Sequence, residues 1–290
     1  MDQLRFDGQS AIVTGAGSGL GRAYAHELAA RGAAVVVNDL GEAAAQAVVD
    51  QIMASGGRAV ACPATVATRE GGQTIVDTCL REFGRVDVLV NNAGILNREN
   101  FVDLSFEDME RILDVHVRGA LHVTHPTFAL MLRQGSGRVI NTTSGAVFGL
   151  RTRADYATAK AAIIGFTRAL AAEGADAGVH VNAVMPMATT GMTGTFFADL
   201  ADRFGPEHVA PTVAWLAHPT CPVNGEIYSV GAGHVARVFL AETQGWTELD
   251  ADRHRAEDVR DNHDVIADEA GYFVPSSIQE ELELVFKLVT

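Results

Sequence analysis

The feature that most constrains the fold is a glycine-rich stretch, Thr14-Gly15-Ala16-Gly17-Ser18-Gly19-Leu20-Gly21. Residues 10–13 before it are short and apolar, as in a buried strand, and residues 21–29 after it have helical spacing of apolar side chains. Glycines at a strand-to-helix turn let the backbone approach a pyrophosphate, and the helix start offers free N–H groups. The stretch favours a dinucleotide-binding turn, although glycines also occur in turns for purely steric reasons.

A second predicted strand, residues 34–38, is followed by Asp39. Asp39 lies 24 positions (39 − 15) after Gly15, where a dinucleotide fold places a carboxylate that accepts hydrogen bonds from ribose hydroxyls. The same carboxylate would repel the 2′-phosphate of NADP. Asp39 therefore strengthens the dinucleotide interpretation and points to NAD.

Apolar strand patterns alternate with helical patterns over most of the chain. The predicted strands are 10–14, 34–38, 58–61, 86–90, 137–141, 179–184 and 226–230, and the predicted helices are 19–31, 42–55, 69–83, 107–133, 155–175 and 207–217. Such alternation predicts an α/β fold with a doubly wound parallel sheet (Rossmann) and helices on both faces. A ligand then belongs at the carboxyl ends of the strands.

Tyr156 and Lys160 stand four apart in a predicted helix, so their side chains share one face. A phenol with a pKa near ~10 is a poor base, but a neighbouring ammonium favours the phenolate. Tyr156 could then take a proton from an alcohol. For this pair taken alone, the alternative is that the tyrosine and the lysine have this spacing by chance.

The glycine turn, Asn91-Asn92-Ala93-Gly94 and the set Ser144, Tyr156 and Lys160 together resemble the short-chain dehydrogenase/reductase family in order and spacing. The resemblance implies an NAD(P)-dependent oxidoreductase with Ser144, Tyr156 and Lys160 as catalytic residues and no metal. Ser18 and Leu40 are neutral where NADP users of this family often carry a basic residue, which again predicts NAD. The implied cofactor-binding residues are Gly15, Gly17, Ser18, Gly19, Leu20, Gly21, Asp39, Val66, Asn92, Ala93, Gly94, Tyr156 and Lys160.

The chain departs from the family pattern at two positions. The family serine stands thirteen residues before the tyrosine, which would be Thr143, whereas its distance from Asn141 selects Ser144. Choosing Ser144 implies that the loop before Tyr156 is one residue shorter. His116 stands where the family has a catalytic asparagine, and either proton relay or simple packing is open for it.

A narrower resemblance is to the dehydrogenase domain of the type-two peroxisomal multifunctional enzymes. The motifs that carry it are residues 37–41, 92–96, 115–119, 206–211, 230–233 and 277–280. This resemblance implies NAD-dependent interconversion of a secondary alcohol and a ketone on a bulky apolar substrate, a (3R)-hydroxyacyl-CoA or a hydroxysteroid. One alternative is an NADPH-dependent 3-oxoacyl reductase, against which Asp39 argues. Another is a catalytically silent NAD-binding regulatory or scaffold protein.

Two segments interrupt the alternation. Residues 187–206 follow the sixth strand without a clear period, and we interpret them as a substrate lid in which Met187, Met192, Phe196 and Phe197 cover the site; an ordinary long connection is the alternative. We place a Rossmann NAD-binding and catalytic domain at 1–239. A C-terminal extension at 240–290 would pack on the body or on a partner subunit, as in a homodimer or homotetramer.

Composition narrows the partners and the compartment. The formal net charge of −14 argues against a nucleic-acid surface. The small-molecule apolar substrate is what the resemblance implies. Three widely spaced cysteines argue against a disulfide framework and fit a reducing compartment. No apolar run approaches the length of a membrane span, and we expect a cytoplasmic protein.

Overall fold

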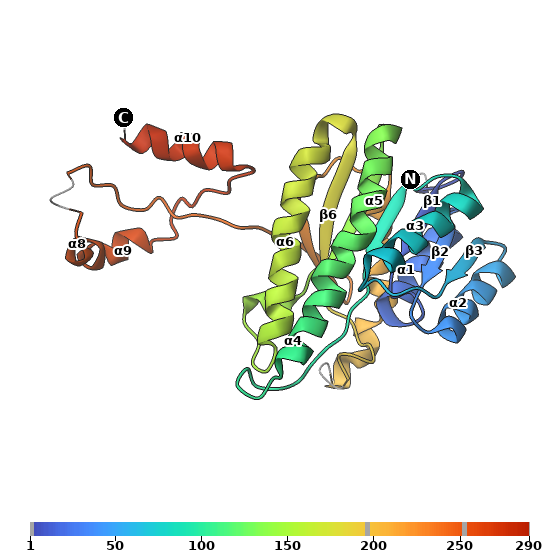
Figure 1. Cartoon of the computed structure of the whole chain (residues 1–290). Helices are drawn as coiled ribbons and strands as arrows, with labels where there is room; N and C mark the ends of the chain where they lie inside the picture. Colours follow the sequence, from blue (N-terminus) through green and yellow to red (C-terminus); the bar gives the residue numbers. More distant parts are fainter. Residues whose placement is uncertain (1–2, 195–197, 251–253, 290) are drawn as a thin grey trace. The chain divides into compact units, whose positions relative to one another are not determined.

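The computed structural model describes residues 3–194, 198–250 and 254–289. The chain divides into two compact units, residues 1–237 and residues 238–290. The first unit is built on an eight-stranded sheet in the order β3-β2-β1-β4-β5-β6-β7-β8 (Figure 1). The strands are β1 (Ser10–Val13), β2 (Ala34–Asn38), β3 (Arg58–Cys62), β4 (Val88–Asn91), β5 (Gly137–Thr142), β6 (Val179–Pro186), β7 (Ile227–Gly231) and β8 (His234–Val238).

Strands β1 to β7 are parallel, and their order reverses between β1 and β4. In the centre of the sheet Ile12 is in register with Val36 on one side and with Leu89 on the other. The predicted doubly wound parallel sheet is confirmed. A crevice at such a reversal, at the carboxyl ends of the strands, is where ligands bind in open α/β sheets.

Neighbouring residues of a strand point to opposite faces of the sheet, and helices bury both faces. Ala11 and Val13 belong to one core with α1 (Gly19–Ala30), α2 (Glu42–Ala54) and α7 (Ala210–Ala217). Ile12 belongs to a second core. That core is shared with α3 (Arg69–Phe83), α5 (Gly119–Gln134) and α6 (Ala154–Gly174).

The predicted helix over 107–133 is interrupted in the structure. It consists of α4 (Phe106–Leu113), a π-helical turn at Asp114–Arg118 and then α5. A π turn inserts one residue relative to an α-helix and is frequent at functional sites. His116 is buried within this turn. Short 3₁₀ helices cover Gly145–Phe148, Ala175–Ala177, Ala198–Phe204 and Pro206–His208.

Strand β8 was absent from the prediction. Two residues, Ala232 and Gly233, connect it to β7, and both have positive φ (49° and 80°). A two-residue connection with positive φ at both positions is the usual tight turn of a hairpin. Alanine rarely adopts this conformation, so the dipeptide gave only a weak turn signal.

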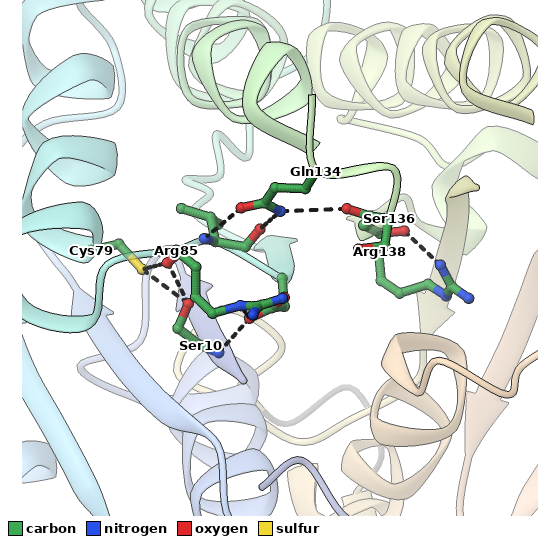
Figure 2. Close-up of polar contacts among 9 residues, drawn as sticks. Ser10, Cys79, Arg85, Gln134, Ser136 and Arg138 are labelled. Carbon is green, nitrogen blue, oxygen red and sulfur yellow. Dashed lines mark hydrogen bonds and ion pairs between the residues drawn. The ribbon is translucent and has the colours of Figure 1, made fainter. Parts of the chain in front are cut away.

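The amino ends of the central strands carry a polar network (Figure 2). The backbone N–H of Ser10 donates to the Asp87 carboxylate at 2.8 Å, and Arg85 donates to both oxygens of the same carboxylate at 2.6 to 2.9 Å. The amide of Gln134 donates to Val86 O at 2.8 Å. The buried guanidinium of Arg138 donates to three backbone oxygens, of Gly137, Gly178 and Pro219.

The second unit contains α8 (Ala256–Asp261), α9 (His263–Ile266) and α10 (Ile278–Val289). Within it Glu242 pairs with Phe273 through two backbone hydrogen bonds of 2.8 and 2.7 Å. The backbone N–H of Glu280 donates to Ser277 Oγ at 3.3 Å, the contact expected of a capping box. Among the described residues no helix combines the length and the hydropathy needed to cross a membrane.

Candidate active site

The glycine turn lies at the carboxyl end of β1 and leads into α1. Gly15 and Gly19 have φ of 62° and 51°, which side chains disfavour. A Cβ on Gly21 would stand 2.2 Å from Gly15 O, so the turn closes only with glycine there. The N-cap residue Ser18 makes no side-chain capping bond, which leaves N–H groups at the start of the 12-residue α1 for another acceptor.

Asp39 follows β2 and reaches over the glycine turn. Its carboxylate accepts from the backbone N–H of Gly17 at 2.9 Å and of Gly41 at 3.0 Å. A Cβ on Gly17 would come within 2.8 Å of Asp39 Oδ2. The pyrophosphate donors and the ribose acceptor expected from the sequence are thus brought together, and the donor set fits a dinucleotide.

The Asn92-Ala93 segment is fastened to the glycine turn by Thr14. Thr14 Oγ1 accepts from the backbone N–H of Asn92 at 3.0 Å and of Ala93 at 3.1 Å. The Asn92 side chain donates back to Thr14 O at 3.0 Å and Gly15 O at 3.2 Å. These contacts hold the ends of β1 and β4 in one rigid edge beside the predicted cofactor residues. Sequence reasoning missed Thr14, whose signal was a hydroxyl at the end of a buried strand.

Lys160 is fully buried beneath Tyr156. Its Nζ donates to Thr142 O at 2.6 Å and lies 5.6 Å from the centre of the Tyr156 ring. Burial lowers the pKa of Lys160 to about 7. Lys160 can therefore gain or lose a proton near neutral pH, which a solvated lysine cannot.

The Ser144 side chain lies near the Tyr156 hydroxyl and influences its pKa. Burial raises the pKa of Tyr156, and the Ser144 side chain and the charge of Arg153 lower it by smaller amounts. The net direction is opposite to the one expected from a neighbouring lysine, because burial penalises the phenolate and Lys160 itself has a pKa near 7. In the chain alone the phenol therefore stays protonated at neutral pH.

The structure separates the roles of Thr143 and Ser144. The Thr143 hydroxyl is buried and donates to Lys160 O at 2.7 Å, so it points into α6. Ser144 instead caps the 3₁₀ helix, accepting from the backbone N–H of Ala146 at 3.2 Å, and reaches Tyr156. The geometry brings Ser144, and not Thr143, to the Tyr156 hydroxyl.

Comparison with known proteins places these residues in a family. Residues 9–201 match the short chain dehydrogenase family. The chain belongs to that family. Over 289 residues it is 42% identical to mouse peroxisomal multifunctional enzyme type 2, covering 96% of this chain and 39% of the mouse protein. The chain thus spans less than half the length of that relative.

Solved structures agree with the family assignment. The full-length peroxisomal multifunctional enzyme type 2 of Drosophila melanogaster has a TM-score of 0.85 and 33% identity, covering 99% of this chain and 50% of that one. A 7α-hydroxysteroid dehydrogenase, solved with NADH and 7-oxoglycochenodeoxycholic acid, has a TM-score of 0.74 and 30% identity. It covers 80% of this chain and 98% of its own. The chain is therefore an oxidoreductase of a family that binds NAD(P).

In this short chain dehydrogenase His116 lies beside Tyr156 and Lys160. Its ring meets the Tyr156 ring edge to face, with centres 5.2 Å apart. Nε2 lies 2.8 Å from Ile95 O and 3.0 Å from Ile95 N. Burial and then the charge of Lys160 lower the pKa of His116 to about 3, so the ring is neutral in the working range.

A small cavity joins His116 to Lys160. Its accessible volume of about 10 Å³ is close to that of one water molecule, and its lining includes Thr14, Asn91 and Val66. Val66, predicted at the cofactor site, is buried here, and Val66 O contacts His122 Nδ1 at 3.1 Å. Two polar atoms nearby, His116 Nδ1 and Thr142 Oγ1, have no partner among the described residues.

The predicted lid is described over residues 187–194 and 198–206. Arg98 Nη2 donates to Met192 O at 2.6 Å, and a Cβ on Gly19 would lie 3.4 Å from the Thr190 methyl group. The segment 190–194 thus spans from the glycine turn to Arg98. Met187 is tied to β7 through Val230 O at 2.7 Å. Phe196 and Phe197 lie outside the described residues.

Proposed function

We propose that this chain is an NAD-dependent dehydrogenase that interconverts a secondary alcohol and a ketone. The observation that carries the proposal is the arrangement of Ser144, Tyr156 and Lys160 at the carboxyl edge of the sheet. Ser144 would hydrogen-bond the substrate oxygen. Tyr156 would take the alcohol proton in oxidation and return it in reduction. Lys160, with a pKa of about 7, would exchange that proton near neutral pH.

The proposal of NAD rests on the Asp39 carboxylate. NAD would be held at the α1 start by residues 15–21, at the ribose by Asp39 and near Tyr156 by residues 92–94, Val66 and Lys160. When bound, NAD supplies the hydride acceptor. A 2′-phosphate at Asp39 would meet a second negative charge, and Gly17 and Gly41 donate only backbone N–H groups there.

We propose a bulky apolar substrate, a (3R)-hydroxyacyl-CoA or a hydroxysteroid. Its apolar body would contact side chains that the structure leaves exposed around the site, namely Phe148 (72% exposed), Leu150 (47%) and Met192 (39%). Burying an apolar body there is worth roughly 25 cal/mol per Å². The names of the multifunctional-enzyme and hydroxysteroid-dehydrogenase relatives support the same two substrate classes.

Three further expectations belong to this proposal. The enzyme would work in the cytoplasm, as a homodimer or homotetramer. Residues 1–239 would form the catalytic domain. Residues 240–290 would pack on the body or on a partner subunit, because α10 carries exposed apolar side chains such as Ile278 (61%) and Phe286 (58%).

An initial-rate screen tests the proposal. Purified protein is assayed with (3R)-hydroxyacyl-CoAs and hydroxysteroids of increasing apolar size, with NAD and with NADP, beside a small polar alcohol. We expect turnover with NAD and kcat/KM that rises with apolar bulk. Equal efficiency on the small polar alcohol would refute the apolar substrate class. Binding of NAD without turnover of any alcohol would support a silent NAD-binding protein instead.

A further inference from the structure

Two arginines far apart in the sequence, Arg98 and Arg153, lie on segments that meet next to Tyr156. The contact that joins their segments is between Asn97 Nδ2 and Asp155 Oδ2, at 2.8 Å. Asp155 in turn accepts from the backbone N–H of Tyr156 through Oδ1 at 2.7 Å. The segment after β4 and the start of α6 are therefore fastened together next to the catalytic tyrosine.

Arg98 links this junction to the lid segment. Its Nη2 donates to Met192 O at 2.6 Å and lies 3.7 Å from where a Cβ on Gly194 would stand. A guanidinium has five N–H donors in a planar fork, so this bond leaves others for a second acceptor. Arg98 is exposed, and these donors are open to a ligand that enters beside the lid.

Arg153 is held by the turn that precedes α6. Its Nη1 donates to Thr152 O at 2.7 Å and to Thr152 Oγ1 at 3.1 Å. Thr152 has φ of 63°, which a β-branched residue rarely adopts. The side chain is thereby bent back over the turn, with the rest of its fork directed away from those two oxygens.

Arg98 and Arg153 form no ion pair with the part of the chain that the structure describes. Among the residues that the structure describes, no carboxylate lies within ion-pair distance of either guanidinium. The adjacent Asp155 spends its two oxygens on Asn97 and the Tyr156 backbone. Burial and then the charge of Arg98 lower the pKa of Arg153, whereas the charges of Asp155 and Tyr156 raise it. The guanidinium of Arg153 is therefore close enough to Arg98 and to Tyr156 to interact with both electrostatically.

We propose that Arg98 and Arg153 form a subsite for a negatively charged group of the substrate, a carboxylate or a phosphate. A planar guanidinium binds either group through paired charge-assisted hydrogen bonds. In a chain with a net charge of −14, two cations near Tyr156 without an ion-pair partner among the described residues select for an anion against the overall field. The inference rests on the proposed function and narrows it, since an apolar alcohol with an anionic end is preferred over a neutral steroid.

Matched substrate pairs test the subsite. One pair is a (3R)-hydroxyacyl-CoA and the same acyl group on N-acetylcysteamine, which removes the phosphates. The second pair is a hydroxysteroid with a side-chain carboxylate and its methyl ester. For each pair we compare the KM of the uncharged member with the KM of the charged member. In the pair whose anion occupies the subsite, Arg98→Ala or Arg153→Ala should raise the KM of the charged member, so this ratio should fall by about tenfold.

The control is Arg133→Ala, which removes the same charge from an exposed position near the end of α5. It should leave both KM ratios as in the wild type. Ratios unchanged in the Arg98 and Arg153 variants, or KM values that rise equally for charged and uncharged members, would overturn the subsite. Which pair responds identifies the anion as phosphate or carboxylate.

Calorimetric titration separates this inference from the proposed function. Free coenzyme A and the steroid carboxylate are titrated into the wild-type protein loaded with NAD and into the two variants. Binding that is weakened about tenfold in the variants supports the subsite even if no alcohol is turned over, which would contradict the proposed function alone. Equal affinity in all three proteins, or no binding of either probe, contradicts the subsite.

Discussion

The two ends of the central sheet each hold a buried ionisable side chain, and these two side chains are hydrogen-bonded to different extents. At the amino end Asp87 is 6% exposed, and its oxygens are shared by the Ser10 backbone and the Arg85 guanidinium. At the carboxyl end Lys160 is 4% exposed with one described acceptor, Thr142 O. There the Thr142 hydroxyl and His116 Nδ1 find no partner among the described residues.

This difference separates stability from chemistry. Saturated hydrogen bonds of the Asp87 carboxylate stabilise the fold at the amino end, although Gln9 Oε1, Arg138 Nε and His180 Nδ1 near the starts of β1, β5 and β6 are buried without a described partner. Under-satisfied groups at the carboxyl end cost stability but remain ready to bind a ligand or move a proton. Polar substitutions should therefore lower stability at one end and activity at the other.

The largest effect expected is the loss of activity in Tyr156→Phe. The variant lacks the hydroxyl that would transfer the proton, so kcat/KM should fall by roughly 100-fold or more while NAD binding is retained. Steady-state kinetics and calorimetric NAD titration measure the two. The control is Tyr24→Phe, which removes a fully buried hydroxyl without a described partner and should keep full activity. Near-normal turnover in Tyr156→Phe would refute the assignment.

Asp87→Ala probes the opposite end. It leaves the buried Ser10 N–H without an acceptor and Arg85 without its ion-pair partner, so the free energy of unfolding should fall by about 2 kcal/mol. Urea unfolding measures this change, and kcat/KM per folded molecule should stay as in the wild type. The exposed Asp77→Ala on α3 is the control, with an effect near zero. A catalytic defect in folded Asp87→Ala would break the comparison between the two ends.

Ser144→Ala and Thr143→Ala test activity and stability separately at two adjacent residues. Ser144→Ala removes the hydroxyl that lies near Tyr156 and should lower kcat/KM at least about tenfold more than Thr143→Ala does. Thr143→Ala loses the hydrogen bond to Lys160 O and should lower the free energy of unfolding by about 1 kcal/mol. The reverse ranking of activities would mean that Thr143 is the functional hydroxyl.

Cofactor preference sharpens the description of the carboxyl end. Because Asp39 lies over the glycine turn, kcat/KM with NAD should exceed that with NADP at least ~10-fold, about 1.4 kcal/mol. Asp39→Ala should reduce the preference mainly by improving NADP, which separate kinetics with each cofactor would show. Equal efficiency with both cofactors in the wild type would contradict the role of Asp39.

A gain of stability is expected in Lys160→Met. Burial lowers the pKa of Lys160 from 10.5 in the unfolded chain to about 7, so below pH 7 the fold carries the full penalty of a buried charge. Between pH 7 and 10.5 the unfolded state binds more protons, and wild-type stability rises with pH. Melting midpoints of the cofactor-free proteins should be higher for Lys160→Met at pH 6.5 and converge toward pH 10. A lower midpoint for the variant at pH 6.5 would contradict this picture.

Local sequence patterns predicted much of the fold and part of the candidate site. Strands buried on both faces, such as Val35-Val36-Val37, are recognisable by composition, and the glycine turn is set by steric limits of a few adjacent residues. The proximity of Tyr156 and Lys160 follows from helical spacing. These features depend on contacts that are close in sequence.

What the sequence did not predict depends on contacts between distant segments. The meeting of the segments that carry Arg98 and Arg153 is fixed by the Asn97–Asp155 bond across 58 positions. The direction of the Tyr156 pKa follows from burial, which spacing does not report. Strand β8 depends on Ala232 adopting a positive φ that its residue type disfavours.

The π turn at Asp114–Arg118 has a consequence for insertions and deletions. A π turn is an α-helix with one residue too many, so the chain from Phe106 to Gln134 already contains a tolerated single-residue insertion. Deleting one residue there would restore a continuous α-helix in which α4 and α5 keep their faces, but the bulge that carries His116 would be lost. His116 would then turn away from the Ile95 backbone. The length of this helix, to the single residue, is as much a determinant of the site as the residue types it carries.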